Sequence, residues 1–167
     1  LFKSEKITDD RFRAVSYSPD GHWLLGDADW QRGIVKLIDA QSGKTTHDFA
    51  VSEYNGFLYS LSISFSTDSR YFVTNFWTKA NYGLKIFDVQ SGSLFRTIVS
   101  SSKIYSVAFS PDNRQVAGGS SQLAAIWDTQ TGKLLHPLVG HTATVNGITY
   151  SPDGRLLVTG SVDKTVK

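Results

Sequence analysis

The chain has 167 residues, of which 40% are hydrophobic and 19% are charged, a composition typical of one globular domain. Its 17 Lys and Arg residues nearly balance its 15 Asp and Glu residues, and the sequence contains no Lys/Arg-rich run that would indicate a general nucleic-acid-binding surface. Cysteine is absent, which excludes disulfides, thiol catalysis, and Cys-ligated zinc or iron–sulfur sites.

Two turn signatures alternate along the chain. The first is Ser-Pro-Asp-Gly or a close variant, and the second is an Asp followed four residues later by Gly. Pro suits the second position of a tight turn and Gly accepts a positive φ, so both signatures predict turns. Two turn types interleaved at one period indicate an internal repeat of about forty residues. The first signature begins at Ser18, Ser66, Ser110 and Ser151, and the second spans 39–43, 88–92 and 128–132.

The segments between these turns are rich in β-branched and aromatic residues and predict strands. No stretch combines a helical period with helix caps. Each repeat is therefore predicted to hold four short strands, a to d, with the first signature as the a–b turn and the second as the c–d turn. In chain order the expected strands lie at 15–17, 23–25, 35–38, 63–65, 71–73, 84–87, 107–109, 124–127, 148–150 and 156–158.

A four-stranded twisted sheet cannot bury both of its faces alone, whereas radial stacking of such sheets does so and forms a β-propeller. We therefore predict an all-β propeller of four-stranded antiparallel blades. The predicted order is strand d of a preceding blade at 1–10, blade one at 11–49, blade two at 50–99, blade three at 100–139 and an incomplete blade four at 140–167.

These motifs resemble the WD-repeat family, most strongly from residue 104 onward. The resemblance rests on Trp127-Asp128, Gly140-His141 and the long stretch from Ser151 to Lys167. It implies a propeller of seven or eight blades, of which about four repeats are present. Blades one and two are less regular, since Ile38 and Phe87 replace the Trp. There, segments 71–75 and 86–92 also resemble YVTN-type surface-layer and lactonase propellers, which share the propeller fold.

The ends of the chain bear on this interpretation. The sequence begins with Leu1 and contains no Met, so we expect a processed, trimmed or partial chain. The alternative is a closed four-bladed ring in which the N-terminal strand pairs with the C-terminal strands. An open half-propeller would expose sheet faces and edges, and we expect it to self-associate through them.

The WD-repeat resemblance also implies a hydrogen-bonded tetrad in the regular blade. Its members here would be His141, Ser161 and Asp163, and the matching Trp would fall two residues beyond Lys167. Buried polar side chains that satisfy one another would staple the edge of the blade. The alternative is metal or acid–base chemistry, but the spacing matches a structural staple and no fourth ligand is evident.

Added loop length falls on one face of blades one and two, the face that carries the d–a and b–c connections and that the family's convention calls the top. These loops are rich in aromatic residues and Arg, which are enriched at binding hot spots. The alternative is that the aromatic rings fold back and fill gaps left by the missing tetrads. The predicted partner-binding residues are Trp30, Arg32, Tyr54, Phe57, Trp77 and Tyr82, with Arg11, Tyr59, Lys103 and Thr144 ringing the channel mouth.

The sequence therefore predicts a non-catalytic scaffold or adaptor that binds a protein or peptide partner through its top face. We expect no cofactor, no metal, no specific nucleic acid and no membrane contact, and by default a cytoplasmic or nuclear location. The alternative is a lactonase-type propeller enzyme or a surface-layer protein. An enzyme of that type would need carboxylates with His or Arg at the channel mouth, where Asp27, Asp29 and Arg11 are the nearby candidates. The commoner interpretation of Asp27 and Asp29 is exposed loop acids.

Overall fold

The computed structural model describes residues 14–29, 33–52 and 62–167. These residues form fourteen strands in four antiparallel sheets, and no helix occurs among them. Three of the sheets have four strands in sequential order, and the last has two. The predicted fold class, an all-β arrangement of propeller blades, is confirmed.

The first sheet contains β1 (Val15–Tyr17), β2 (Trp23–Asp29), β3 (Ile34–Asp39) and β4 (Thr45–Ala50). The second contains β5 (Ile63–Phe65), β6 (Tyr71–Trp77), β7 (Tyr82–Asp88) and β8 (Leu94–Ser100). The third contains β9 (Ser106–Phe109), β10 (Gln115–Gly119), β11 (Leu123–Asp128) and β12 (Leu134–Val139). The fourth contains β13 (Val145–Tyr150) and β14 (Leu157–Ser161), and a single bridge from Gly160 to Val166 begins a third strand.

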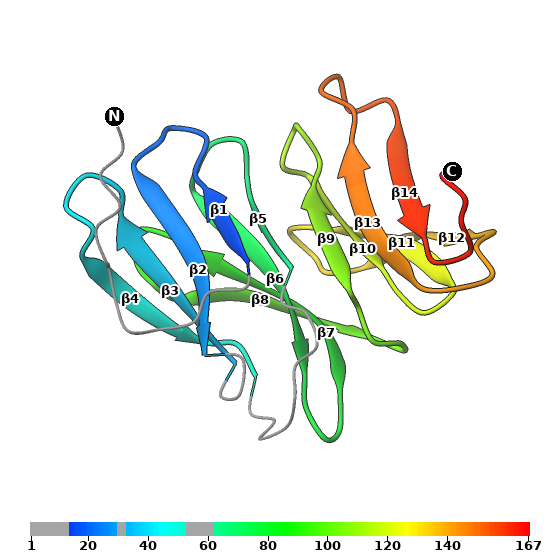
Figure 1. The fold of residues 1–167 in the computed structure, drawn as a ribbon, viewed down its shortest axis with the longest axis horizontal. Coiled ribbons are helices and arrows are strands. Elements are labelled where there is room, and N and C mark those ends of the chain that lie inside the picture. The colour runs from blue at the N-terminus through cyan, green and yellow to red at the C-terminus, as the bar shows by residue number, and fades with distance from the viewer. Residues whose placement is uncertain (1–13, 30–32, 53–61) are drawn as a thin grey trace.

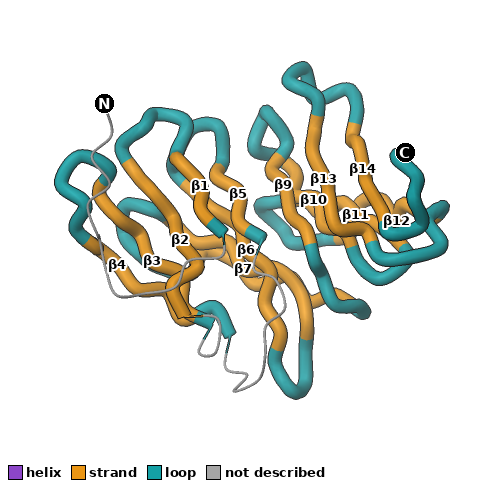
Figure 2. The backbone as a smooth tube through the Cα atoms, viewed as in Figure 1, coloured by secondary structure: helices purple, strands orange, loops and turns teal. Residues whose placement is uncertain are grey.

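The four sheets follow one another in chain order, and their first strands β1, β5, β9 and β13 are consecutive neighbours (Figure 1). The a–b turns point to the upper side of Figure 1, and the β6–β7 hairpin, a b–c connection, points to the lower side. Figure 2 shows that loops join the strands throughout the described chain. The b–c and d–a side, which points down in these views, is called the top face below.

Two hydrophobic clusters hold the first three sheets together. In the first, between sheets one and two, the ring of Phe72 is fully buried and lies 4.8 Å from the ring of Phe49 and 5.1 Å from that of Phe87. The second cluster joins sheets two and three and includes Ile98 and Trp127. Burial of apolar surface between adjacent sheets is the main contribution to the stability of such a stack.

The a–b turns share one hydrogen-bond pattern, which explains their sequence signature. In the third sheet the Ser110 hydroxyl donates to Asp112 Oδ1 at 2.6 Å and accepts the backbone N–H of Gln115 at 2.9 Å. The Ser110 hydroxyl, and after it the Arg114 N–H that Asp112 also accepts, hold the pKa of the Asp112 carboxyl below its ordinary value. Asn113 has φ 61°, the left-handed conformation that Gly154 adopts with φ 70° at the equivalent position. The turn geometry is therefore preserved where the sequence departs from Ser-Pro-Asp-Gly.

The c–d turns are built around an Asp that caps the turn with its side chain. In the third sheet, Asp128 Oδ1 accepts the Thr131 N–H at 2.7 Å and the Thr131 hydroxyl at 2.6 Å. β4 ends at Ala50 and β8 at Ser100, each one residue beyond the predicted limit of its blade, and the strand predicted at 1–10 lies outside the described residues. Among the described residues, no helix has the length and hydrophobicity needed to cross a membrane.

Candidate partner-binding face

The described part of the top face includes some of the residues that sequence analysis predicted for partner binding. Trp77 and Tyr82 flank the β6–β7 hairpin, Lys103 lies between β8 and β9, and Thr144 lies just before β13. The structure thus places four of the ten predicted residues on this face. The other six, Arg11, Trp30, Arg32, Tyr54, Phe57 and Tyr59, lie outside the described residues.

Trp77 is folded into the protein, with only 5% of its surface exposed. Its indole N–H donates to the carbonyl of Ile104 at 3.2 Å, and its ring meets that of Tyr105 edge-on at 5.4 Å. The Ser52 hydroxyl donates to the carbonyl of Trp77. The prediction of Trp77 as an exposed hot spot is therefore corrected: its ring fills the junction between the second and third sheets, because its N–H finds a partner there.

Lys103 lies above this buried ring and is exposed. Its ammonium nitrogen is 5.0 Å from the centre of the Trp77 ring and 5.9 Å from that of the half-buried Tyr82. A cation within about 6 Å of an aromatic face is attracted by the ring's negative quadrupole. We call Trp77, Tyr82, Lys103 and Tyr105 the Lys103 cluster. It presents a positive charge to solvent on a rigid aromatic base.

Asn75 helps to hold this base in place, a role that the sequence analysis missed. Asn75 is 1% exposed, donates from Nδ2 to the Ile104 carbonyl at 2.8 Å and accepts the Ser62 N–H at 2.8 Å. Blades three and four have glycines, Gly119 and Gly160, at the same position of the repeat. The polar side chain in place of a glycine was the signal in the sequence. Asn75 and Trp77 both donate hydrogen bonds to the Ile104 carbonyl. These bonds join blade two, which has no Gly-His tetrad, to blade three.

The structure brings two of the three predicted tetrad residues together in the fourth sheet. His141 Nδ1 lies 2.8 Å from Asp163 Oδ2, and His141 is 8% exposed. His141 Nε2 instead meets the hydroxyl of Thr159 at 2.9 Å, a residue that sequence analysis did not name. The Ser161 hydroxyl turns away, donating to the Ala143 carbonyl at 3.0 Å and accepting the Asp163 N–H at 3.1 Å. Ser161 therefore orders the b–c turn and does not contact His141.

Asp163 is surrounded by donors from both top-face segments of the fourth sheet. Its carboxylate accepts the Thr142 N–H at 3.0 Å and the Thr165 hydroxyl at 2.6 Å. The Thr165 hydroxyl is the largest cause of a pKa held far below the ordinary range of an aspartate, with the Thr142 N–H and His141 adding to it. Thr144 completes the link, since its carbonyl accepts the Val162 N–H at 2.9 Å. These bonds tie the connection before β13 to the turn after β14.

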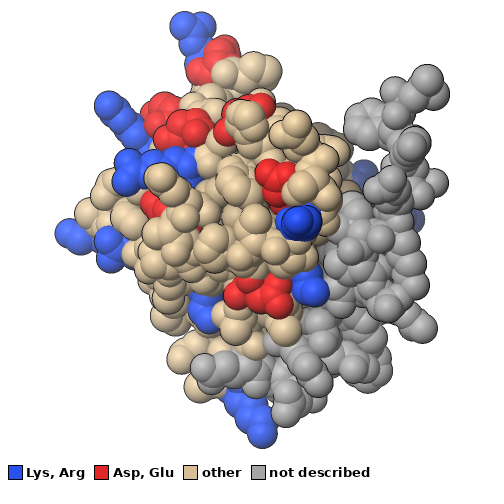
Figure 3. Space-filling model, turned by 90° about the vertical axis from the view of Figure 1, so that its left-hand side faces the viewer, with Lys and Arg blue, Asp and Glu red and all other residues tan. Residues whose placement is uncertain are grey.

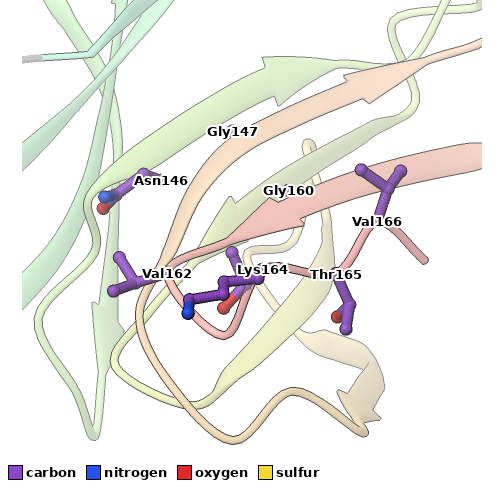
Figure 4. A pocket seen from close by; sticks show the side chains of 8 residues that line it. Asn146, Gly147, Gly160, Val162, Lys164, Thr165 and Val166 are labelled. Carbon is purple, nitrogen blue, oxygen red and sulfur yellow. The ribbon is translucent and has the colours of Figure 1, made fainter.

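A hollow of about 470 Å³ opens on the fourth sheet. Figure 4 shows Asn146 and Val162 at one end of it and Val166 at the other. Gly147 and Gly160 are among its lining residues, and a Cβ added at Gly160 would meet nothing within 4 Å. At the equivalent Gly119 of the third sheet, a Cβ would come within 2.7 Å of the Val145 carbonyl of the following sheet. The hollow is therefore the uncovered face of the fourth sheet.

The described residues contain no group of three or more His, Cys, Asp and Glu side chains able to hold a metal. Asp27 was expected to be an exposed loop acid. It lies instead within β2, paired with Val35, and is 1% exposed. The strand continues to Asp29 because β3 provides partners that far along the ladder. The expected position of Asp27 in a loop is thus wrong.

Comparison with known proteins adds to this geometry. The sequence model described as "WD domain, G-beta repeat" matches residues 92–128 and 132–167. The chain is 34% identical over 156 residues to the WD repeat-containing protein SL1-17 of Schistosoma mansoni, a match that covers 92% of this chain and 45% of that protein. It is 30% identical over 145 residues to a serine-threonine kinase receptor-associated protein of Dictyostelium discoideum, covering 80% of this chain and 42% of that protein.

A shorter match, 40% identical over 63 residues, is to the intraflagellar transport protein 122 homolog of Mus musculus, and it covers 38% of this chain and 5% of that protein. The chain thus spans less than half the length of these relatives.

Proposed function

The chain carries WD repeats, and from this premise we propose that it is a non-catalytic scaffold that binds a protein or peptide partner through the loops of its top face. The observation that carries the proposal is the Lys103 cluster. An exposed ammonium lies over the Trp77 ring, whose position is set by a hydrogen bond from its N–H to the Ile104 carbonyl. Loops held on a rigid sheet scaffold are the usual place for binding residues in such folds.

Two features of the described top face support binding to a macromolecule. Its loops emerge from several sheets, so one partner could contact more than one blade at once. The surface residues at the Lys103 cluster combine a half-buried Tyr with a cation, and Tyr is among the residues enriched at binding hot spots.

The experiment uses the full-length protein, tagged and cross-linked in cells from its natural source, with bound peptides identified by mass spectrometry. We expect a double variant, Tyr82→Ala with Lys103→Ala, to lose the partners that the wild type captures. The matched control is Lys44→Ala with Lys133→Ala, because both lysines are exposed in c–d turns on the opposite face. Retention of every partner by the top-face variant, with loss in the control, would show that binding uses another surface.

The alternative, a lactonase-type propeller enzyme, makes a different prediction. It requires that the full-length protein hydrolyse lactones in a metal-dependent manner, and that Asp27→Asn abolish this hydrolysis. Under the scaffold proposal we expect no hydrolysis above the buffer rate. We further expect a cytoplasmic or nuclear location, which imaging of the tagged full-length chain would test.

A further inference from the structure

We propose that the partner segment docking on the top face is acidic, and that its carboxylates meet Lys103. This inference rests on the proposed function and adds the chemistry of the partner. It depends on three observations: the separation of charge between the two faces, the arrangement around the Lys103 ammonium, and the absence of a carboxylate beside it among the described residues.

Charge is divided between the two faces of the described sheets. The top-face segments 78–81, 101–105, 120–122, 140–144 and 162–167 contain four lysines, and their one acidic side chain, Asp163, is occupied by the hydrogen bonds described above. The opposite face has an Asp in every a–b turn and at the start of every c–d turn, seven in all against five Lys and Arg. In Figure 3 most of the visible Asp and Glu side chains lie toward the upper side, with Lys and Arg side chains beside them. These segments of sheets two to four therefore attract a negatively charged partner.

Lys103 is the lysine best placed to use this charge. Contact with the rings of Trp77 and Tyr82 limits the conformations of its side chain before a partner arrives. Less conformational entropy is then lost on binding than for a lysine free in solvent. By contrast, Lys167 already donates to the Gly140 carbonyl at 2.9 Å.

Within the described residues, no carboxylate lies in ion-pair distance of the Lys103 ammonium. The Lys103 side chain is exposed, and its ammonium has three N–H donors. The aromatic rings do not offer these donors the strong hydrogen-bond acceptor that a carboxylate provides. An Asp or Glu side chain of a partner supplies the missing acceptor. The contact would be a charge-assisted hydrogen bond above an aromatic base.

The arrangement favours an acidic peptide over a nucleic acid. The four lysines lie in three separate segments, interspersed with Ser and Thr, and form no continuous track for a phosphate backbone. Single-stranded nucleic acids also need exposed aromatic faces on which bases stack. The Trp77 ring is 5% exposed and cannot provide one.

The test measures binding of short fluorescent probes to the full-length protein by anisotropy. The probes are a peptide alternating Glu with Gly, the same peptide with Gln for Glu, and an oligothymidylate of equal charge. We expect the Glu peptide to bind, the Gln peptide to bind at least about tenfold more weakly, and salt to weaken the difference. Lys103→Glu should reduce Glu-peptide affinity about three- to tenfold, while Lys103→Arg retains it. Lys133→Glu, the same charge change on the opposite face, should have little effect.

Circular dichroism of each variant checks that it is folded. An equal loss of Glu-peptide affinity in Lys103→Glu and Lys133→Glu would overturn the inference, because it would mean that the affinity depends only on the net charge of the protein. Tighter binding of the oligothymidylate would overturn it in favour of a nucleic acid. If the top-face variant loses its cellular partners but Glu and Gln peptides bind alike, the scaffold proposal survives and the acidic partner does not.

Discussion

Replacement of two equivalent glycines by alanine tests the packing of one blade against the next. Gly119 and Gly160 occupy the same position in the b strands of the third and fourth sheets. A Cβ at Gly119 would lie 2.7 Å from the Val145 carbonyl oxygen and 2.6 Å from the Ser106 hydroxyl. A Cβ at Gly160 would meet nothing within 4 Å. Neither glycine has a positive φ, so the two sites differ in their neighbours and not in backbone strain.

The expected magnitudes follow from these distances. At Gly119 the nearest neighbours include backbone, which cannot rotate away, so the fourth sheet must shift from the third. Overpacking of this kind costs about 1–3 kcal/mol in the free energy of unfolding. At Gly160 the reduced entropy of the unfolded chain should stabilise the protein by up to about 1 kcal/mol.

The assay is urea denaturation of variants of this 167-residue chain, in which Gly160 is uncovered, followed by tryptophan fluorescence, with the midpoint and slope compared with the wild type. Hydrogen exchange would locate the effect of Gly119→Ala at the β9–β10 and β13–β14 amides. Equal shifts of the midpoint in both variants would refute the reasoning, since they would mean that the contact between sheets three and four does not limit the space at Gly119.

Three further predictions concern the core and the titrating groups. Phe72→Ala should lower the free energy of unfolding by about 3–5 kcal/mol in urea denaturation, because the fully buried Phe72 ring contacts the rings of Phe49 and Phe87. Tyr71→Ala, at a half-buried position, should lower it by less. His141→Ala should leave the Thr159 hydroxyl without its buried partner and cost about 1–3 kcal/mol, seen as faster hydrogen exchange confined to β13 and β14. Burial, with a smaller contribution from Asp112, raises the pKa of Tyr150 to about 12, above its unfolded value of 10.0. The stability linked to Tyr150 should therefore be complete below pH 10.0 and decline as the pH rises toward about 12. Tyr150→Phe should remove the last step of the alkaline absorbance titration, and an unchanged titration would contradict the assignment.

The turns show what local sequence can predict. A Ser hydroxyl that reaches an Asp two residues later and an N–H five residues later closes a turn by itself, as Ser110 does. Because these partners are near in sequence, the signature was sufficient to predict each a–b and c–d turn, and with them the four-strand repeat and the propeller class. Substitution of Asn113 for Gly did not disturb the prediction, since Asn tolerates the left-handed conformation.

The candidate site shows what local sequence could not predict. Thr159 and Ser161 are hydroxyl residues two positions apart on β14, and the spacing offers no basis for choosing which one meets His141. That choice depends on the irregular pairing between β13 and β14, where the register shifts between Val145 and Gly147. The orientation of Trp77 likewise depends on a carbonyl of the next blade, 27 residues away.

The sequence alone therefore determined the turns, because hydrogen bonds between near neighbours close them, and through their regular spacing it determined the repeat of four strands. Only the tertiary structure decided that Trp77 is buried, that Asp27 belongs to a strand, that Thr159 pairs with His141, and that Lys103 rests on aromatic rings. Each of those outcomes depends on a contact between separate strands or blades, whose partners become neighbours only when the sheets are packed together.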